Sequence, residues 1–455
     1  MMPRGVATVL AVALLTAAAG AQTASPVRPI QFSDTRLANG LRVIISEDHF
    51  APVYAIAVSY SVGSKDERPG RTGFAHLFEH MMFKGSDNIG PGEHFFLVFN
   101  NGGSMNGTTN TDRTLYYEVM PRNQLDLGLF LESDRMRSLA ITKENLDNQR
   151  QAVQEERRLR LDNQPYGKSA ERFNELAYDN PAYHHSVIGS MEDLNAATVE
   201  DVAGFFRTYY APNNAVVAIV GDVDTKDTLT RVEKYFGNIP RQPSPAPVDL
   251  AEPEMKAERR ETMQGRLARL PQINIGYKIP PATHADFPAL SALGQILGNG
   301  ESSRLYQRLV KTQELCANIG SGSTQRLGPG LFNITCAVRP GKNIADAEAA
   351  ITDEIARLQT AAVTSEELQR IRSSARRGSV SIRESTLARA QSLADNAAVY
   401  NDPNRINTNA QKIAAVTAAD VQRVAGRYLQ TTNRVVVHTL PATAPAVAPP
   451  APVAK

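Results

Sequence analysis

The chain has 455 residues, and its 49 Lys and Arg nearly balance its 47 Asp and Glu, which leaves a formal charge of +2. This balance argues against a nucleic-acid-binding protein, because such proteins usually carry a strongly basic domain. Hydrophobic residues make up 42% of the chain, enough for a large buried core and too many for a disordered protein. A chain of this length is expected to fold as two or three domains.

The first 21 residues have the pattern of a secretory signal peptide. Arg4 precedes an uncharged apolar run, residues 5–20, which is shorter than the ~20 residues that span a bilayer. The run ends in Ala19-Gly20-Ala21, the small-x-small pattern that a signal peptidase cleaves. We therefore expect export with Gln22 as the first mature residue, and a periplasmic location in a cell with two membranes. An uncleaved anchor is the alternative; no later segment predicts stable membrane insertion.

Two strands are expected next, at 42–46 and 53–62, followed by an amphipathic helix. Apolar residues from Phe74 to Met82 recur at i, i+3, i+4, i+7 and i+8, which is one face of a helix. Thr72 is expected to cap the start of this helix and Gly85 to end it.

The same helix carries His76-Leu-Phe-Glu79-His80. Histidines at i and i+4 lie on one side of a helix, one turn apart, so both imidazoles can reach a single Zn²⁺. Glu79 stands beside the second histidine, where a carboxylate can accept a proton from a metal-bound water. This order is the inverse of the commoner metalloprotease motif. The motif predicts a zinc site with Glu79 as general base.

A catalytic zinc usually has three protein ligands and one open position. Spacing alone leaves the third ligand open between another histidine and a carboxylate of the polar helix expected at 142–161. That helix carries Glu155 and Glu156. By its pattern alone, it is more typical of a solvated charged face.

Two distant stretches of the chain are alike. Thr198-Val-Glu-Asp-Val202 corresponds to Thr417-Ala-Ala-Asp-Val421, and the match continues in the same register to the valines at 216–217 and 435–436. Each stretch predicts a helix capped by its threonine, a short turn and a buried strand. The repeat predicts an internal duplication, with similar helix–turn–strand units as the plainer alternative.

The fold class expected from alternating strands and helices is α/β (α+β). We expect two related domains, each a mixed, largely antiparallel sheet covered by helices, with one of those helices at 344–361. The predicted divisions are a first domain, a Pro-rich surface linker, a second domain and a disordered Ala/Pro-rich tail. Their ranges are 28–236, 237–264, 265–440 and 441–455, respectively.

The chain has two cysteines, Cys316 and Cys336, in expected strands at 315–320 and 331–338. A hairpin centred near residue 326 would set the two cysteines directly opposite each other. Directly paired strand cysteines strain disulfide geometry, so we expect two buried thiols, although export would permit oxidation.

The zinc motif, followed by Val153-Gln-Glu-Glu156, resembles the M16 metallopeptidases, the pitrilysin-type zinc proteases with an inverted motif. That family takes its third zinc ligand, a Glu, at a fixed spacing after the second histidine, and this spacing implies Glu156 rather than Glu155. The resemblance covers about residues 33–440 and is greatest to the short-subunit branch, which includes the mitochondrial processing peptidase type. It implies two related α/β domains and one Zn²⁺ per chain.

Two further segments extend or qualify the resemblance. Gly102-Gly-Ser-Met-Asn106-Gly-Thr-Thr109 resembles the family's substrate-binding edge strand, which implies that Asn106 contacts the substrate backbone. Seven residues before its ligand Glu the family usually has another Glu, and here Gln149 stands in that position. Gln149 implies weaker charge behind the metal rather than an inactive site. Gly107, where the family usually has Ala, is expected to be harmless.

The resemblance implies an exported zinc-dependent endopeptidase that hydrolyses extended peptides or unfolded segments through a zinc-bound water, with Glu79 as base. A catalytically silent binding or assembly subunit of the same fold is the alternative, and a zinc-storing or zinc-sensing protein is a weaker one. The intact His76, Glu79, His80 and Glu156 favour the enzyme.

A partner subunit is also expected. In M16 enzymes an Arg and a Tyr seven residues later hold the substrate near the zinc, and in this chain Val310 and Ala317 occupy the matching positions. The interpretation is a heterodimer, in which a homologous subunit without the zinc motif supplies the Arg/Tyr pair. A pair that has moved or is dispensable is the alternative.

Overall fold

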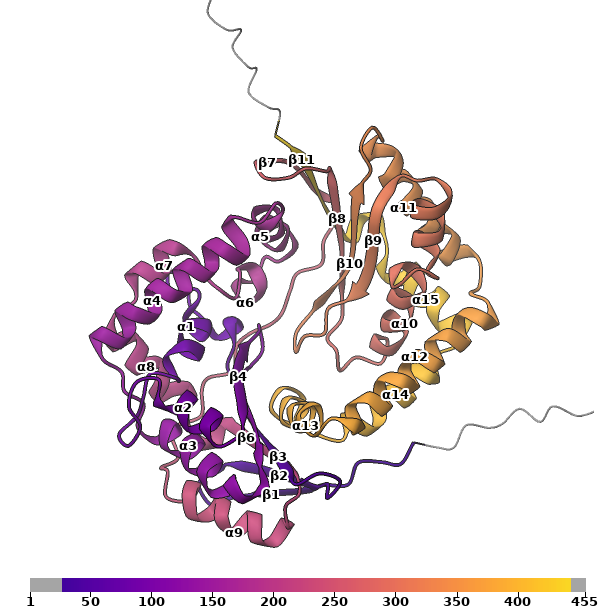
Figure 1. The fold of residues 1–455 in the computed structure, drawn as a ribbon. Helices are drawn as coiled ribbons and strands as arrows, with labels where there is room; N and C mark the ends of the chain where they lie inside the picture. The colour runs from indigo at the N-terminus through magenta and orange to yellow at the C-terminus, as the bar shows by residue number, and fades with distance from the viewer. Residues whose placement is uncertain (1–26, 443–455) are drawn as a thin grey trace, which may run out of the picture.

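The computed structural model describes residues 27–442, which form two halves that face each other (Figure 1). The expected signal peptide, residues 1–21, and nearly all of the expected tail lie outside the described residues. The first half contains a six-stranded sheet in the order β1-β2-β6-β3-β5-β4, and the second a five-stranded sheet in the order β7-β11-β8-β10-β9. The strands are β1 Ser33–Arg36, β2 Arg42–Glu47, β3 Val53–Tyr60, β4 Ser104–Thr109, β5 Thr114–Pro121, β6 Ala215–Gly221, β7 Arg259–Gly265, β8 Gln272–Ile279, β9 Cys316–Ser323, β10 Gly330–Val338 and β11 Arg434–Pro441.

Both sheets are mixed and mostly antiparallel, as the sequence predicts. The parallel pairs are β2 with β6 and β11 with β7, and the other paired strands run antiparallel. Strand β4 is an edge of the first sheet, since it pairs only with β5 in the strand order. The outer side of β4 is therefore free of a neighbouring strand of its own sheet.

One face of each sheet is covered by helices of the same half of the chain. In the first half, apolar side chains of β3 such as Tyr54, Ile56 and Val58 pack with α1, α3, α8 and α9. In the second half, Ile273 and Ile275 of β8 pack with α10, α11 and α15. The α-helices are α1 Phe74–Met81, α2 Glu93–Asn100, α3 Leu125–Arg137, α4 Lys143–Arg157, α5 Gly167–Ala177, α6 Pro181–His184, α7 Met191–Ala196, α8 Val199–Tyr209, α9 Thr225–Phe236, α10 Phe287–Gly298, α11 Ile344–Thr360, α12 Ser365–Glu384, α13 Thr386–Tyr400, α14 Arg405–Ala414 and α15 Ala418–Tyr428.

The two halves exchange a helix across the molecule. The other face of the first sheet presents Ala55 and Ala57, whose small side chains let α13 of the second half pack closely with Leu393 and Ala394. Reciprocally, Phe173 of α5 packs on the second sheet with apolar residues of β10 and β11. Figure 1 shows α13 beside the first sheet and α5 beside the second. Each sheet is thus buried on both faces only when the two halves are together.

The structure bears out the internal repeat. Thr198 caps α8 and Thr417 caps α15, each in a capping box with the aspartate three residues later. Strands β3 and β8 begin at Val53 and Gln272, and these two positions have the same separation along the chain as the two threonines. The duplication is therefore visible in the elements as well as in the sequence.

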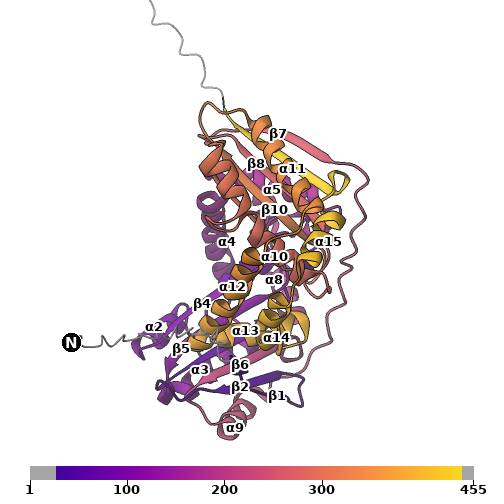
Figure 2. The same cartoon turned by 90° about the vertical axis from the view of Figure 1, so that its right-hand side faces the viewer.

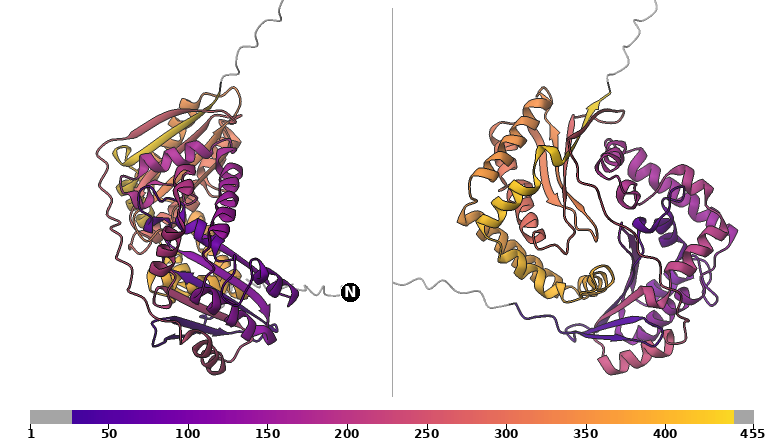
Figure 3. Two further views of the ribbon diagram at one scale, coloured as in Figure 1. Left: turned by 90° about the vertical axis from the view of Figure 1, so that its left-hand side faces the viewer. Right: turned by 180° about the vertical axis from the view of Figure 1, so that it is seen from behind.

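The segment after α9 follows the prediction only in part. Figures 2 and 3 show it running along the edge of the molecule from α9 to β7. Strand β7 begins at Arg259, so residues 259–264, expected in the linker, instead pair in parallel with β11. No helix in the described range 27–442 is long and apolar enough to cross a membrane.

The expectation of two free thiols was wrong, because Cys316 and Cys336 form a disulfide. The expected hairpin is present, but it is centred between residues 327 and 328 rather than near 326, so Cys336 pairs with Ile319; a bulge between Ala337 and Val338 leaves Cys316 opposite Val338. The two cysteines are therefore diagonal neighbours, with Cα atoms 6.0 Å apart, within the usual range for a bridge.

Candidate metal centre

Helix α1, which carries the histidine motif, begins differently from the prediction. Its N-cap is Gly73, at φ +85°, and a side chain there would meet the Ile188 carbonyl oxygen at 2.5 Å. The buried Glu67 carboxylate accepts hydrogen bonds from Gly73 N at 2.8 Å and Ala75 N at 2.7 Å. Thr72 does not cap the helix, since its hydroxyl donates to Asp193 instead. The helix ends at Met81, before Gly85.

Three potential metal ligands converge from two helices. His76 and His80 project from α1, and Glu156 projects from the last turn of α4; one ligand atom from each lies within 4.8 Å of the others. Glu156 Oε2 is 3.6 Å from His76 Nε2 and 3.2 Å from His80 Nε2. Two ligand atoms in a tetrahedral zinc site lie roughly 3.3–3.6 Å apart. The donor set and its spacing therefore fit Zn²⁺.

Burial keeps both histidines in the form that binds a metal. Desolvation lowers the pKa of His76 to about 4, with the neighbouring His80 adding to the effect. Burial also lowers the pKa of His80, against the opposing influence of Glu156. Near neutral pH the two imidazoles are therefore uncharged, and each offers a nitrogen lone pair.

Glu79 lies beside the ligands and is held by a strand of the sheet. Burial raises the pKa of its carboxyl, while a hydrogen bond from Thr109 opposes that rise. The Thr109 hydroxyl donates to Glu79 Oε2 at 2.6 Å. Thr109 ends the edge strand β4, so the edge strand and the proposed base are physically connected.

Gln149 and Asn106, the two further residues implied by the family resemblance, lie close to the site. Gln149, on α4, is buried. A hydrogen bond with its side chain partly opposes the burial that lowers the pKa of His80. Asn106 is exposed on β4, and its Oδ1 accepts a hydrogen bond from Gly107 N at 2.8 Å. A side chain at Gly107 would meet Glu79 Cγ at 3.0 Å, so this glycine leaves room for the carboxylate.

Sequence reasoning missed three residues at the site. Thr109 lay within the recognised edge-strand segment, but a strand threonine gives no signal that it bonds a carboxylate. Arg160 follows Glu156 by four residues, a spacing that predicts an ion pair on a helix, and its Nη1 lies 2.9 Å from Glu156 Oε1. Glu67 caps α1 from outside the usual capping positions, which no local pattern predicts.

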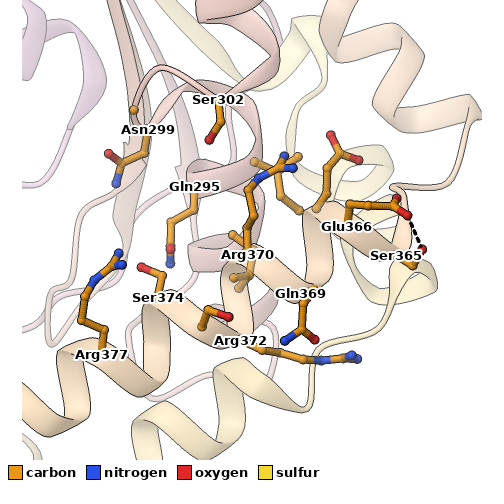
Figure 4. A pocket seen from close by; sticks show the side chains of 15 residues that line it. Gln295, Asn299, Ser302, Ser365, Glu366, Gln369, Arg370, Arg372, Ser374 and Arg377 are labelled. Atoms are coloured by element: carbon orange, nitrogen blue, oxygen red, sulfur yellow. Dashed lines mark hydrogen bonds between the residues drawn. The ribbon is translucent and has the colours of Figure 1, made fainter. Parts of the chain in front are cut away.

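The second half has a cavity where the repeat would place the same site. In the internal repeat, Gln295 and Asn299 occupy the positions that correspond to His76 and His80, at the same separation as Thr198 and Thr417. They line a cavity of about 860 Å³ between α10 and α12. Figure 4 shows these amides across from Ser374 and Arg377 of α12. Amide, hydroxyl and guanidinium groups are poor zinc ligands. Within residues 27–442, no metal-binding group of three His, Cys, Asp or Glu side chains occurs in the second half.

Comparison with known proteins gives one family for both halves. Residues 42–189 match the model of the insulinase family, peptidase family M16, and residues 196–375 match the M16 inactive domain. The chain is 31% identical over 409 residues to the zinc protease PqqE of Helicobacter pylori, covering 89% of this chain and 92% of that protein.

Solved structures agree with the sequence comparison. The crystal structure of a protease from Helicobacter pylori superposes with a TM-score of 0.86 and 31% identity, over 90% of this chain and 100% of the other. The first half of the periplasmic protease PqqL from Escherichia coli has the same fold, with a TM-score of 0.75 and 18% identity over 91% of this chain and 93% of that one. The chain belongs to peptidase family M16 and is a metallopeptidase.

Proposed function

We propose that the chain is an exported zinc endopeptidase that cleaves extended peptides or unfolded segments. His76, His80 and Glu156 would hold one Zn²⁺, and Glu79 would act as general base. One observation carries the proposal: three ligand atoms meet within 4.8 Å beside a carboxylate that is not itself needed as a ligand. A storage or sensor site would have no use for such a carboxylate.

The protein groups divide the chemistry between them. Zinc bound here would supply a Lewis acid that lowers the pKa of a water in its open position towards ~7 and polarises the scissile carbonyl. Glu79 accepts the proton of the attacking water and delivers it to the leaving amine, so the carboxylate ends the cycle ionised. Its buried environment, which raises the carboxyl pKa, favours proton acceptance.

The free edge of β4 supports an extended substrate. Main-chain groups of an edge strand can pair with a peptide strand, which tolerates many side-chain sequences. Asn106, exposed on this strand, would contact the peptide backbone there. The Asn106 side chain already accepts from Gly107 N, so it can exchange that bond for one with the substrate.

Substitutions at the centre test the roles separately. Glu79→Gln should keep zinc bound and abolish cleavage of an unstructured peptide, whereas His80→Ala should lose both. Glu156→Gln should lose zinc, and its exposed neighbour Glu155, which pairs with Arg158, gives a matched control in Glu155→Gln. Substantial turnover by Glu79→Gln would exclude it as the base. Full zinc binding by the wild type without any cleavage, with or without a partner, would favour the silent-subunit alternative.

A homologous partner subunit is part of the proposal. The two positions that match the family's Arg/Tyr pair are Val310, which is buried, and Ala317, which lies on β9. Both side chains are aliphatic, so neither offers a guanidinium or a phenol to a substrate. The match of residues 196–375 to a family model described as inactive agrees with a single zinc site in this chain. The purified chain should bind one zinc and cleave poorly until a non-zinc M16 subunit exported from the same locus is added. Full activity of the isolated chain would contradict the heterodimer.

Periplasmic location rests on the signal-peptide pattern at residues 1–21, and the periplasmic Escherichia coli protease of the same fold is consistent with it. N-terminal sequencing of the mature protein should give Gln22, and fractionation should recover it outside the cytoplasm. A mature chain that keeps Arg4 would refute cleavage.

A further inference from the structure

The turn between β4 and β5, residues 110–113, is held from two sides by the second half of the chain. Helix α13 contacts it through Asp395, and the loop between β9 and β10 contacts it through Leu327. This turn begins directly after Thr109, which bonds Glu79. We propose that the Asp395–Arg113 ion pair is a positioning device through which the second half fixes the end of β4 and thereby the direction of Glu79. The inference rests on the proposed role of Glu79 as base.

Arg113 is bonded at both ends of its guanidinium. Its Nε lies 3.0 Å from one oxygen of Asp395 and 3.1 Å from the other. Its Nη1 donates to the Thr108 carbonyl oxygen at 2.8 Å and to the Thr108 hydroxyl at 2.6 Å. The arginine side chain is only 12% exposed. Two bonds from one planar group to a single residue fix both the strand backbone and its side chain.

Asp395 is itself held in place. Its Oδ1 accepts a hydrogen bond from the Ser59 hydroxyl at 3.0 Å, so it is tied to β3 as well as to Arg113. Helix α13 lies against β3 and β6, in an apolar cluster that includes Ala57 of β3 and Ala218 of β6. The carboxylate therefore comes from a rigid part of the second half rather than from a loop.

Asp112 provides a separate hold on the same turn. Its Oδ1 accepts from the Tyr183 hydroxyl at 2.9 Å, and its Oδ2 accepts from Leu327 N at 3.0 Å. The Tyr183 oxygen in turn accepts from Gly328 N at 2.9 Å. The loop between β9 and β10 corresponds by topology to the turn between β4 and β5, so the two equivalent turns of the duplicated unit meet here. Asp112 therefore fixes the turn to the second half, and the hydrogen bonds from Arg113 to Thr108 connect the turn to the end of β4.

An edge strand needs such support more than an interior strand. Strand β4 has a neighbour only on its β5 side, so its last residues have half the strand contacts of an interior strand. The Arg113 bonds to Thr108 replace part of the missing support at the residue next to Thr109. A displacement of ~1 Å in a catalytic group can cost on the order of a hundredfold in rate.

The test compares two ion pairs made by the same helix. Asp395→Asn removes the charge that aims Arg113. Asp48→Asn breaks the 2.9 Å pair between Asp48 and Arg389, six residues before Asp395 on α13, and neither residue of that pair bonds the turn in the described structure. Asp395→Asn should lower kcat about ten- to a hundredfold with KM within threefold, and Asp48→Asn should leave both unchanged. Asp395→Glu should recover part of kcat, and Arg113→Ala combined with Asp395→Asn should be no worse than Arg113→Ala alone.

A second readout does not depend on turnover. Amide hydrogen exchange of residues 104–113 should accelerate in Asp395→Asn and stay at the wild-type rate in Asp48→Asn, with zinc content full in both. Wild-type kcat and unchanged exchange in Asp395→Asn would overturn the inference, as would an equal loss in Asp48→Asn. The assays use the full mature chain with its partner if one is required. Activity of the wild type together with inactivity of Glu79→Gln separates a failure here from a failure of the proposed function.

Discussion

Replacing Thr109 by Val removes the hydrogen bond that holds the Glu79 side chain while keeping the size and β-branching of the residue. The hydroxyl donates to Glu79 Oε2 at 2.6 Å, and a hydrogen bond to an ionised group contributes about 1.5–3 kcal/mol. If the bond orients the base in the transition state, its loss should lower kcat by roughly 10- to 150-fold. The proposed ligands His76, His80 and Glu156 do not bond Thr109, so zinc content should stay at the wild-type level.

Peptide cleavage under saturating substrate measures kcat, and metal analysis of the same samples measures zinc. Thr109→Ser is the matched control, because it keeps the hydroxyl and loses only a methyl group; it should retain most of the activity. A Thr109→Val enzyme within twofold of the wild type would refute the orienting role. Equal losses in the Ser and Val variants would assign the effect to packing instead.

Three other measurements test the rest of the molecule. Removing zinc with a chelator should lower the Tm. Zinc at a hundredfold excess over its Kd should raise the unfolding free energy by about 2.7 kcal/mol, and this gain should vanish in Glu156→Gln but not in Glu155→Gln. Replacing both Cys316 and Cys336 by Ala opens the bridge and should cost about 3 kcal/mol of unfolding free energy; two free thiols in unfolded, unreduced wild type would contradict the bridge. Burial raises the pKa of Glu118 to about 7, so its neutral form stabilises the fold below pH 4.5 and this contribution is lost as the pH rises through 7. The unfolding free energy, measured by urea titration, should therefore fall less between pH 5 and pH 8 in Glu118→Gln than in the wild type, by at most about 3 kcal/mol. The same fall with pH in both proteins would refute that account.

The sequence predicted those parts of the site that depend on local spacing. His76 and His80 are one turn apart on a strongly apolar helix, so their convergence follows from helix geometry alone. Glu156 required the family resemblance, because helix α4 is separated from α1 by two strands and two α-helices, and no periodicity links them. The Glu67 cap lies outside the local window in which capping patterns operate, so local pattern favours Thr72 instead.

Two expectations were wrong for different reasons: one missed a strand partner far along the chain, and the other missed the register of a local hairpin. Strand β7 alternates half-buried and exposed residues and contains three charged side chains, so it resembles a linker; its partner β11 is the last strand within the described residues 27–442. The expected cysteine pairing failed because the hairpin of β9 and β10 is centred between residues 327 and 328 rather than near 326, which changes the residues that face each other. Neither a distant strand partner nor the exact register of a hairpin is encoded in local composition.

The helix exchange between the halves has a consequence for how the chain folds. Ala55 of β3, in the first quarter of the chain, belongs to the same buried apolar cluster as Ala390 of α13, in the last quarter. As the chain emerges from its N-terminus, the first sheet can form its strands early but leaves an apolar face open until the last quarter of the sequence arrives. Contacts of such long separation slow folding and prolong the exposure of aggregation-prone surface. A fragment that ends after α9 should therefore aggregate, because one apolar face of its sheet stays exposed. Nascent chains should bind chaperones until α13 has been synthesised.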